Sequence, residues 1–242
     1  MTMLVAITTP EGIAMSADSR AMAPLPRRDP SDRVTGFVDS EYLIVTDSLE
    51  KLVTLGDRMV CALTGRHSDG AQRVVDRMVA LAPTVPLDDP ASMAETLCHG
   101  LNRWDDSRDA QRANFLLAGY DQAGQPCVFS MIPGPEDPAR WILAEPGGSR
   151  FRINILGDCD VSRRLLTDQP YALDRMTLQD AVTLSRTLIW IESTMRPFEW
   201  RRPSVGGPID TLVIRPGRGV EWVARKTLTA SEPGPPRVAV RA

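Results

Sequence analysis

The stretch that decides the fold is the first one, residues 2–20, TMLVAITTPEGIAMSADSR. Residues 2–8 and 12–19 are dominated by β-branched and small apolar side chains, and Thr-Pro-Glu-Gly between them is typical of a turn. We therefore predict a β-hairpin at the start of the chain. The first residues of most domains are loose, so a strand that begins at Thr2 raises the question of what this residue does.

The rest of the sequence alternates between strand-like and helix-like segments. We expect strands at 41–45, 51–55, 58–64, 113–121, 127–132, 140–145, 150–156, 208–214 and 220–226. Apolar periodicity and capping signals predict helices at 68–82 and 93–104, after Asp158, and behind the Thr177–Asp180 capping box. Residues 21–40, rich in proline and charge, are predicted to be an extended insertion loop on the surface, and residues 230–242 a mobile tail.

This order of elements suits an α+β domain of two sheets packed face to face with helices outside each. With 242 residues and 43% hydrophobic content, the chain has enough apolar side chains for one domain spanning 1–242. Periodicity alone also permits other α+β folds.

Composition argues against several classes of function. The net charge of −3 gives no basic footprint for nucleic acid. No signal peptide and no bilayer-spanning apolar run is recognisable, so we expect a cytoplasmic protein without a membrane partner. The four cysteines stand far apart without a C-x-x-C pair, which indicates reduced and mostly buried thiols. With two histidines only, we expect no metal and no cofactor.

Lysine is scarce. Of 28 basic residues only Lys51 and Lys226 are lysines. A lysine in such a sequence can be one that arginine cannot replace, because only lysine lowers its pKa enough to exchange a proton near neutrality. We expect Lys226, behind the last strand pattern, to be exposed. Lys51 precedes a strand and is the better functional candidate.

Thr2 has the chemistry of a nucleophile if Met1 is removed. A threonine hydroxyl needs a base, and a free α-amine on the same residue, with an ordinary pKa of about 7.7–8.0, supplies one. Lys51 would tune the hydroxyl and Asp18 would pair with Lys51. The backbone N–H of Gly65, before a predicted helix, would stabilise an oxyanion.

These residues resemble the proteasome β-subunit family of N-terminal nucleophile hydrolases. That family opens with Thr, a strand, a glycine turn and a strand that ends in Ala-Asp-Ser-Arg, and it later has a strand-initiating lysine and a strand that ends in a small hydroxyl residue and glycine. Thr2, Asp18 and Lys51 fall at its catalytic positions. The later segments ILGDCDVSRRLL, ESTMR and SVGGPID are similar to Anbu-type bacterial homologues, with HslV more distant. The resemblance covers residues 2 to about 225.

The resemblance implies a four-layer αββα sandwich and amide hydrolysis through an acyl-enzyme on Thr2. It also implies a peptide or protein substrate and a self-compartmentalising homo-oligomer, either a ring or an open helical assembly, and it leaves any ATPase partner unknown. Two alternatives stay open. One is a non-catalytic or assembly subunit of the same fold, and the other is an amidase for a small molecule.

The chain departs from the family where the N-terminal amine is held. The proteasome uses a Ser-Gly before a late helix and an Asp-x-x-Ser near its Gly-Gly, whereas here Asp158 and Ser204 occupy these regions. We expect them to support the amine, although an acid raises the pKa of a neighbouring amine. A helix cap is the alternative for Asp158.

By analogy with the family, the specificity pocket would be formed by Leu63, His67 and Asp69, and Leu63 would make it apolar. Leu63 as ordinary core and Asp69 as a first-turn acid are the alternatives.

Overall fold

The computed structural model describes residues 2–29, 31, 33–64, 76, 78–80, 86, 88–103, 114–134, 141–144, 151–167, 171–199, 202–227, 237 and 238. Its strands are β1 (Met3–Thr8), β2 (Ile13–Ala17), β3 (Ala21–Arg28), β4 (Val34–Thr46), β5 (Leu52–Leu55), β6 (Met59–Thr64), β7 (Asn114–Tyr120), β8 (Pro126–Pro133), β9 (Trp141–Ala144), β10 (Ile153–Gly157), β11 (Asp210–Arg215), β12 (Gly219–Ala224) and β13 (Arg237–Val238). Its helices are α2 (Pro90–Arg103), α3 (Asp160–Thr167), α4 (Leu178–Met195) and the 3-10 helix η3 (Arg196–Glu199). Most of the helix predicted at 68–82 lies outside the described residues.

The protein is a mixed α/β structure built on antiparallel sheets. One five-stranded sheet has the order β10-β1-β2-β11-β12, and another has the order β5-β6-β7-β8-β9. The predicted N-terminal hairpin is confirmed, because β1 and β2 pair antiparallel with Leu4 opposite Ala17. β1 also pairs with β10, so the first strand lies inside its sheet with a neighbour on both sides. Thr2 is therefore attached to an interior strand.

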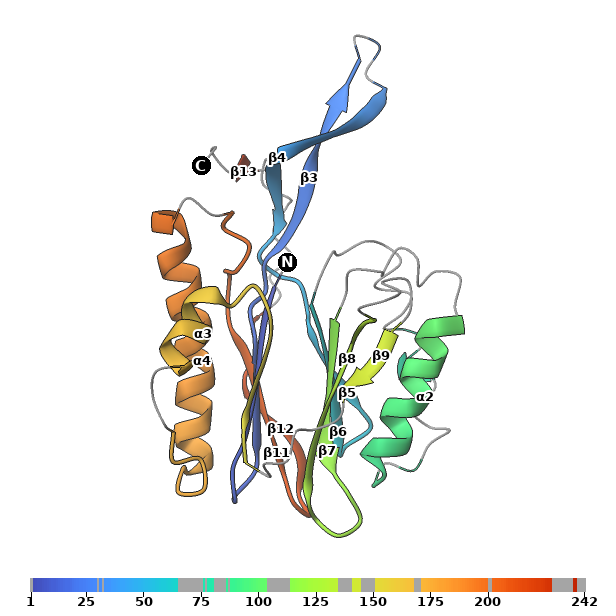
Figure 1. Ribbon diagram of the computed structural model, residues 1–242, viewed down its shortest axis with the longest axis vertical. Helices are drawn as coiled ribbons and strands as arrows, with labels where there is room; N and C mark the ends of the chain where they lie inside the picture. Colours follow the sequence, from blue (N-terminus) through green and yellow to red (C-terminus); the bar gives the residue numbers. More distant parts are fainter. Residues whose placement is uncertain are drawn as a thin grey trace.

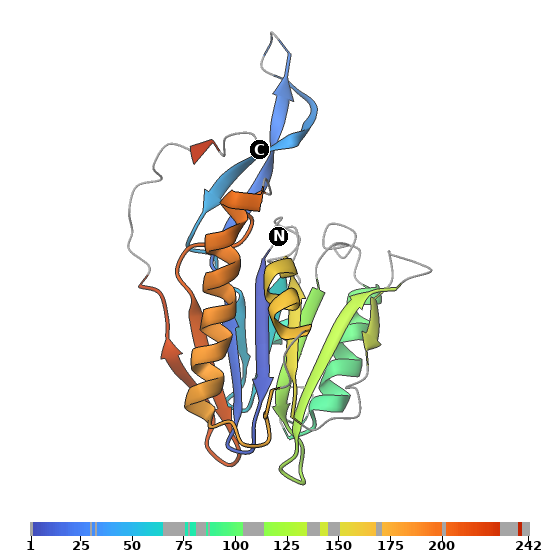
Figure 2. The same ribbon diagram turned by 60° about the vertical axis from the view of Figure 1, so that its left-hand side comes forward.

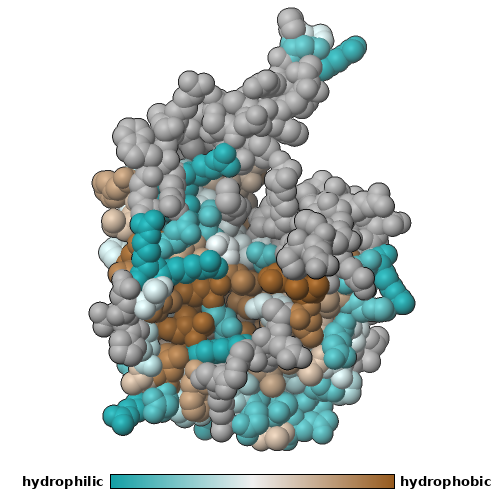
Figure 3. All heavy atoms as spheres, in the orientation of Figure 1, coloured by the Kyte–Doolittle hydropathy of each residue, from teal (hydrophilic) through white to brown (hydrophobic). Residues whose placement is uncertain are grey.

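Three hydrophobic clusters hold these elements together. The inner faces of the two sheets share one cluster, in which Leu4 and Met15 of the first sheet join Val60 and Leu116 of the second. A second cluster joins the outer face of β1 and β2 to α3 and α4. A third joins β6, β7 and β8 to α2. Hydrophobic side chains also gather across the middle of the face seen in Figure 3, over the two sheets.

The capping box predicted for the last long helix is confirmed at the start of α4. The Thr177 side chain accepts from the Asp180 backbone N–H, and the Asp180 carboxylate accepts from the Thr177 N–H. Such reciprocal bonds satisfy two backbone donors that a helix start leaves unpaired.

The prediction of a loop at 21–40 is wrong. β3 and β4 pair antiparallel over this region and form a long two-stranded ribbon that projects from the end of the sheets at which the chain starts (Figures 1 and 2). Proline disfavours a regular strand, but here the ladder shifts register between Pro24 and Pro26. An irregular edge strand tolerates proline because it leaves some N–H groups unpaired.

The C-terminal segment also takes part in this ribbon. In the predicted mobile tail, Arg237 and Val238 form β13 and pair with β4, and the remaining residues from 228 onward lie outside the described ones. None of the helices in the described parts of the chain is long and apolar enough to cross a membrane. Of the four free cysteines, Cys61, Cys98 and Cys159 are buried, which confirms the prediction of mostly buried thiols.

Candidate active site

Asp18 is the centre of the candidate site. It follows β2 directly, and both oxygens of its carboxylate accept two donors. Oδ1 accepts from the backbone N–H of Met3 and from Lys51 Nζ, both at 2.9 Å. Oδ2 accepts from the backbone N–H groups of Gly206, at 3.0 Å, and Arg20, at 3.2 Å. This one carboxylate therefore holds together the start of β1, the residue before β5 and the loop before β11.

Lys51 is buried in this centre, with its side chain 1% exposed. Its ammonium donates to Asp18 and, at 2.7 Å, to the carbonyl of Arg20. Burial lowers the pKa of Lys51, and the charge of Asp18 opposes that shift. An ammonium has three donors, and the contacts among the described residues use two of them. Lys51 thus combines a lowered pKa with one remaining donor next to the first strand.

Thr2 lies beside this ion pair and is 2% exposed. The N–H of the peptide that joins Thr2 to Met3 donates to the same Asp18 oxygen as Lys51. The Thr2 carbonyl accepts from the Asp158 N–H at 2.9 Å and from Thr64 Oγ at 3.3 Å. The structure therefore brings together three of the predicted residues, Thr2, Asp18 and Lys51, from three separate segments.

The close approach of β10 to Thr2 depends on Gly157, which lies opposite Met3 in the ladder. Its φ of +92° lies in the region that favours glycine. A Cβ at this position would lie 1.8 Å from the Thr2 carbonyl oxygen and 2.8 Å from Thr64 Oγ. Only glycine allows β10 to end this near Thr2 without moving backbone.

Asp158 and Ser204, the two residues expected to support the amine, lie in contact with each other. Asp158 follows Gly157, and its carboxylate accepts a short hydrogen bond from Ser204 Oγ. Its other oxygen lies 3.3 Å from the guanidinium of Arg196. Asp158 precedes α3 (Asp160–Thr167), and no capping bond from its side chain to that helix is found among the described residues. The helix-cap alternative has no support in these contacts.

Arg20 organises the opposite side of the site. Its guanidinium forms a two-pronged pair with Asp47, at 2.7 and 3.0 Å, and donates to the Pro203 carbonyl at 3.1 Å. A Cβ on Gly206 would lie 2.5 Å from the guanidinium carbon, so the loop before β11 packs closely on this side chain. The arginine thereby holds the backbone N–H of Gly206 in place for Asp18.

The prediction that Lys226 is exposed is wrong. Its side chain is 5% exposed and forms an ion pair with Asp210, whose side chain is 2% exposed. Asp210 also accepts from the Lys226 backbone N–H at 2.8 Å and lies opposite Ala17, the residue before Asp18. A position behind the last strand pattern favoured exposure, but the sequence does not show that Asp210, on the neighbouring strand, lies within reach of this lysine. Both lysines of the chain are thus buried against aspartates.

The remaining predicted residues are less informative. Leu63 is 8% exposed and packs in the cluster between β6 and α2, which is the core alternative for this residue. Gly65, His67 and Asp69 lie outside the described residues. A cavity of about 420 Å³ lies at the other end of the sheets, lined by Arg58, Tyr120, Arg215 and other residues of the hairpin turns, away from Thr2. Within the described residues there is no group of three potential metal ligands.

Several contacts were not found from the sequence. Arg196 and Glu192 were noted only as part of a similar segment, although they form a buried pair behind Asp158. Their spacing of four on a helix is a known pairing signal and could have indicated it.

The sequence matches no protein-family model and no curated protein.

Proposed function

We propose that this protein is a threonine-type amide hydrolase of the proteasome-like N-terminal nucleophile class, with Thr2 as the nucleophile after removal of Met1. The observation that carries the proposal is the shared Asp18 oxygen. It accepts from Lys51 Nζ and from the backbone N–H of Met3, the residue that follows Thr2, at the same distance, 2.9 Å. A lysine ammonium fixed beside the residue that would carry both nucleophile and base is the arrangement that this chemistry needs.

The proposed reaction proceeds in two steps. The Thr2 hydroxyl adds to the substrate carbonyl carbon and its proton passes to the α-amine of Thr2. The amine then gives this proton to the leaving nitrogen as the C–N bond breaks, which leaves an ester on Thr2. Water hydrolyses the ester with the amine as base again.

In this scheme the other residues stabilise charge. Lys51 lowers the pKa of the Thr2 hydroxyl through the ammonium donor that is not used by Asp18 or the Arg20 carbonyl. Gly65, next to Thr64, supplies the oxyanion donor. The contact of Thr64 with the Thr2 carbonyl supports this role, because it brings the end of β6 to the nucleophile.

We propose further that the fold is the four-layer αββα sandwich. The face-to-face packing of the two sheets and the placement of α4 and α2 on their outer sides support it. The substrate would be a peptide or protein and the enzyme a homo-oligomer that encloses its sites. The projecting ribbon supports an oligomer, because β13 covers only two residues of β4 and the rest of the ribbon has two strands in the part of the chain that is described, an arrangement that is only marginally stable alone.

The two alternatives are separated by the mature N-terminus and the substrate. A non-catalytic subunit of this fold needs no free amine, and it is favoured if Met1 is retained. A small-molecule amidase uses the same residues and is favoured if only a small amide is cleaved, because a fold does not fix its substrate.

The experiment is intact mass followed by covalent labelling with a peptide epoxyketone. We expect loss of Met1 and a single label on Thr2, which is abolished in Thr2→Ala. The control is Thr183→Ala, since Thr183 is an exposed hydroxyl on α4 that bonds only within its helix. A retained Met1, or a label that survives Thr2→Ala, overturns the proposal.

A further inference from the structure

Asp158 lies next to the residue that would carry the proposed active amine, because its backbone N–H donates to the Thr2 carbonyl at 2.9 Å. A carboxylate near an amine favours the charged ammonium and raises its pKa. The proposed base must be neutral to accept the proton of the Thr2 hydroxyl. An uncompensated Asp158 would therefore weaken the base that it helps to position.

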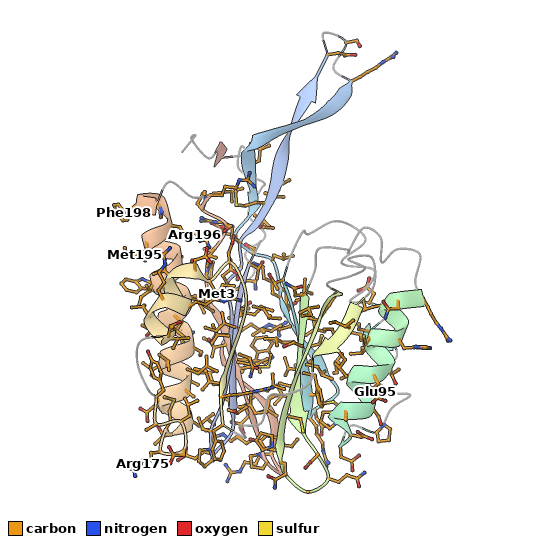
Figure 4. The ribbon with its side chains drawn as sticks, viewed as in Figure 1. Met3, Glu95, Arg175, Met195, Arg196 and Phe198 are labelled. Carbon is orange, nitrogen blue, oxygen red and sulfur yellow. The ribbon has the colours of Figure 1, made fainter. Side chains whose placement is uncertain are left out.

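The structure holds a counter-charge for this carboxylate. Arg196, at the end of α4, has a side chain that is 4% exposed, and its NH2 nitrogen lies 3.3 Å from Asp158 Oδ1. Figure 4 shows Arg196 on the side of this helix end that faces β1, whereas Met195 and Phe198 lie on the outer side. Of these three labelled residues, Arg196 is the one that the fold directs toward the first strand.

Arg196 is itself fixed from behind. Its Nε and NH2 donate to Glu192 Oε1 at 3.1 and 2.9 Å. The other Glu192 oxygen accepts from the Ser162 N–H at 3.0 Å and from Ser162 Oγ at 3.2 Å. Glu192 is completely buried. A guanidinium held this firmly cannot turn away from Asp158, so its position is set by the packing of α3 on α4.

Charges on the other sides of the first strand are already paired. Lys51 balances Asp18, and Arg20 balances Asp47. The guanidinium of Arg196, in contrast, pairs with two carboxylates, those of Asp158 and Glu192. Among the described residues, Arg196 is therefore the group whose removal would change the charge at this side of the amine most.

We propose that Arg196 is a positioning residue that acts through Asp158. It offsets the charge of this carboxylate and fixes its orientation, so that Asp158 and Ser204 can hold the Thr2 amine without keeping it protonated. The inference rests on the proposed function, since it concerns the amine of a mature chain that begins at Thr2.

The test titrates this amine directly. The rate at which acetic anhydride acylates Thr2 is measured against pH on the mature protein by mass spectrometry of the N-terminal peptide. We expect Arg196→Gln to raise the pKa of the amine by about one unit and Arg196→Lys, which keeps the charge, to restore it. Because Arg196→Gln also leaves Glu192 unpaired, Glu192→Gln/Arg196→Gln is made beside it and should show a smaller rise, since it also removes the negative charge of Glu192.

Asp158→Asn gives a second measurement that leaves Arg196 in place. The loss of the carboxylate should lower the pKa of the amine by about one unit or more, because Asp158 lies nearer to Thr2 than Arg196 does, and an unmoved pKa overturns the proposal. In an Asp158→Asn background, Arg196→Gln should raise the pKa less than it does in the wild type, because no carboxylate remains for the arginine to orient. A purely structural arginine would change stability but not this dependence on Asp158.

The outcomes also separate the two proposals. Acylation of the amine needs no peptidase activity, so the expected shifts without epoxyketone labelling would overturn the proposed function alone. Normal labelling with an unmoved amine pKa in the Gln variants would overturn the role of Arg196 alone. A retained Met1 overturns both.

Discussion

Replacement of Gly157 by alanine tests how closely the start of the chain is packed. The new Cβ would lie 1.8 Å from the Thr2 carbonyl oxygen, whereas carbon and oxygen in contact lie about 3.3–3.6 Å apart. Roughly 1.5 Å must therefore open between β10 and Thr2. That movement breaks the hydrogen bond from Asp158 N–H to Thr2, and it changes the bond from Thr64 Oγ as well.

The expected cost has three parts. A left-handed conformation costs a residue with a Cβ about 1–2 kcal/mol. Each lost hydrogen bond costs about 1 kcal/mol, and overpacking a rigid site costs about 1–3 kcal/mol. We expect Gly157→Ala to lower the free energy of unfolding by about 3–6 kcal/mol in total.

The matched control is Gly124→Ala. Gly124 also has a positive φ, +70°, but a Cβ there would meet no atom within 4 Å. This variant therefore carries the conformational cost of about 1–2 kcal/mol without the collision. Urea unfolding followed by circular dichroism measures both variants. Equal losses in the two would refute the close packing of Gly157 on Thr2.

Three further predictions concern buried ionisable groups. Lys226→Met leaves the buried carboxylate of Asp210 unpaired and should lower the free energy of unfolding by about 3–5 kcal/mol. The control Arg225→Met breaks an exposed pair with Glu50 and should cost about 1 kcal/mol or less, so similar losses in urea unfolding would contradict the prediction. Burial lowers the pKa of Lys51 in the folded state, so below pH 10.5 the folded state loses this proton before the unfolded state does. The free energy of unfolding of the wild type relative to Lys51→Arg should therefore rise as the pH approaches 10.5, and a fall would show the reverse shift. Burial raises the pKa of Cys61 to about 12, so maleimide at neutral pH should modify the half-buried Cys127 first in peptide maps, and early modification of Cys61 would argue against its burial.

The strands and most helices could be predicted because their patterns are local. Alternation and turn residues located β1 and β2, and a capping box located α4. The ribbon of β3 and β4 was missed because proline and charge are weighed as loop signals, while its pairing depends on residues far apart in the sequence. Register and irregular pairing are decided by the partner strand, which composition does not describe.

The candidate site was predictable only in part, because some of its contacts join residues far apart in the sequence. Thr2, Asp18 and Lys51 were found from chemistry, spacing and a family resemblance, and the structure places them together. The burial of Arg196 and Lys226 was not predicted because it depends on carboxylates from other elements, namely Asp158 and Asp210. A basic residue in a sequence looks the same whether it faces water or a buried acid.

The order of strands in the first sheet has a consequence for synthesis of the protein. β1 and β2 are made first and pair with each other. The second neighbour of β1 is β10, and the second neighbour of β2 is β11, which begins at Asp210. At about 5–20 residues per second, the ribosome needs roughly 10–40 s to reach that point. Until β10 has been made, both edges of the opening hairpin are unsatisfied, and the edge of β2 stays so until β11 follows, which invites pairing with other nascent chains. We therefore expect yield in cells to depend on how well chaperones shield the first twenty residues until translation is almost complete.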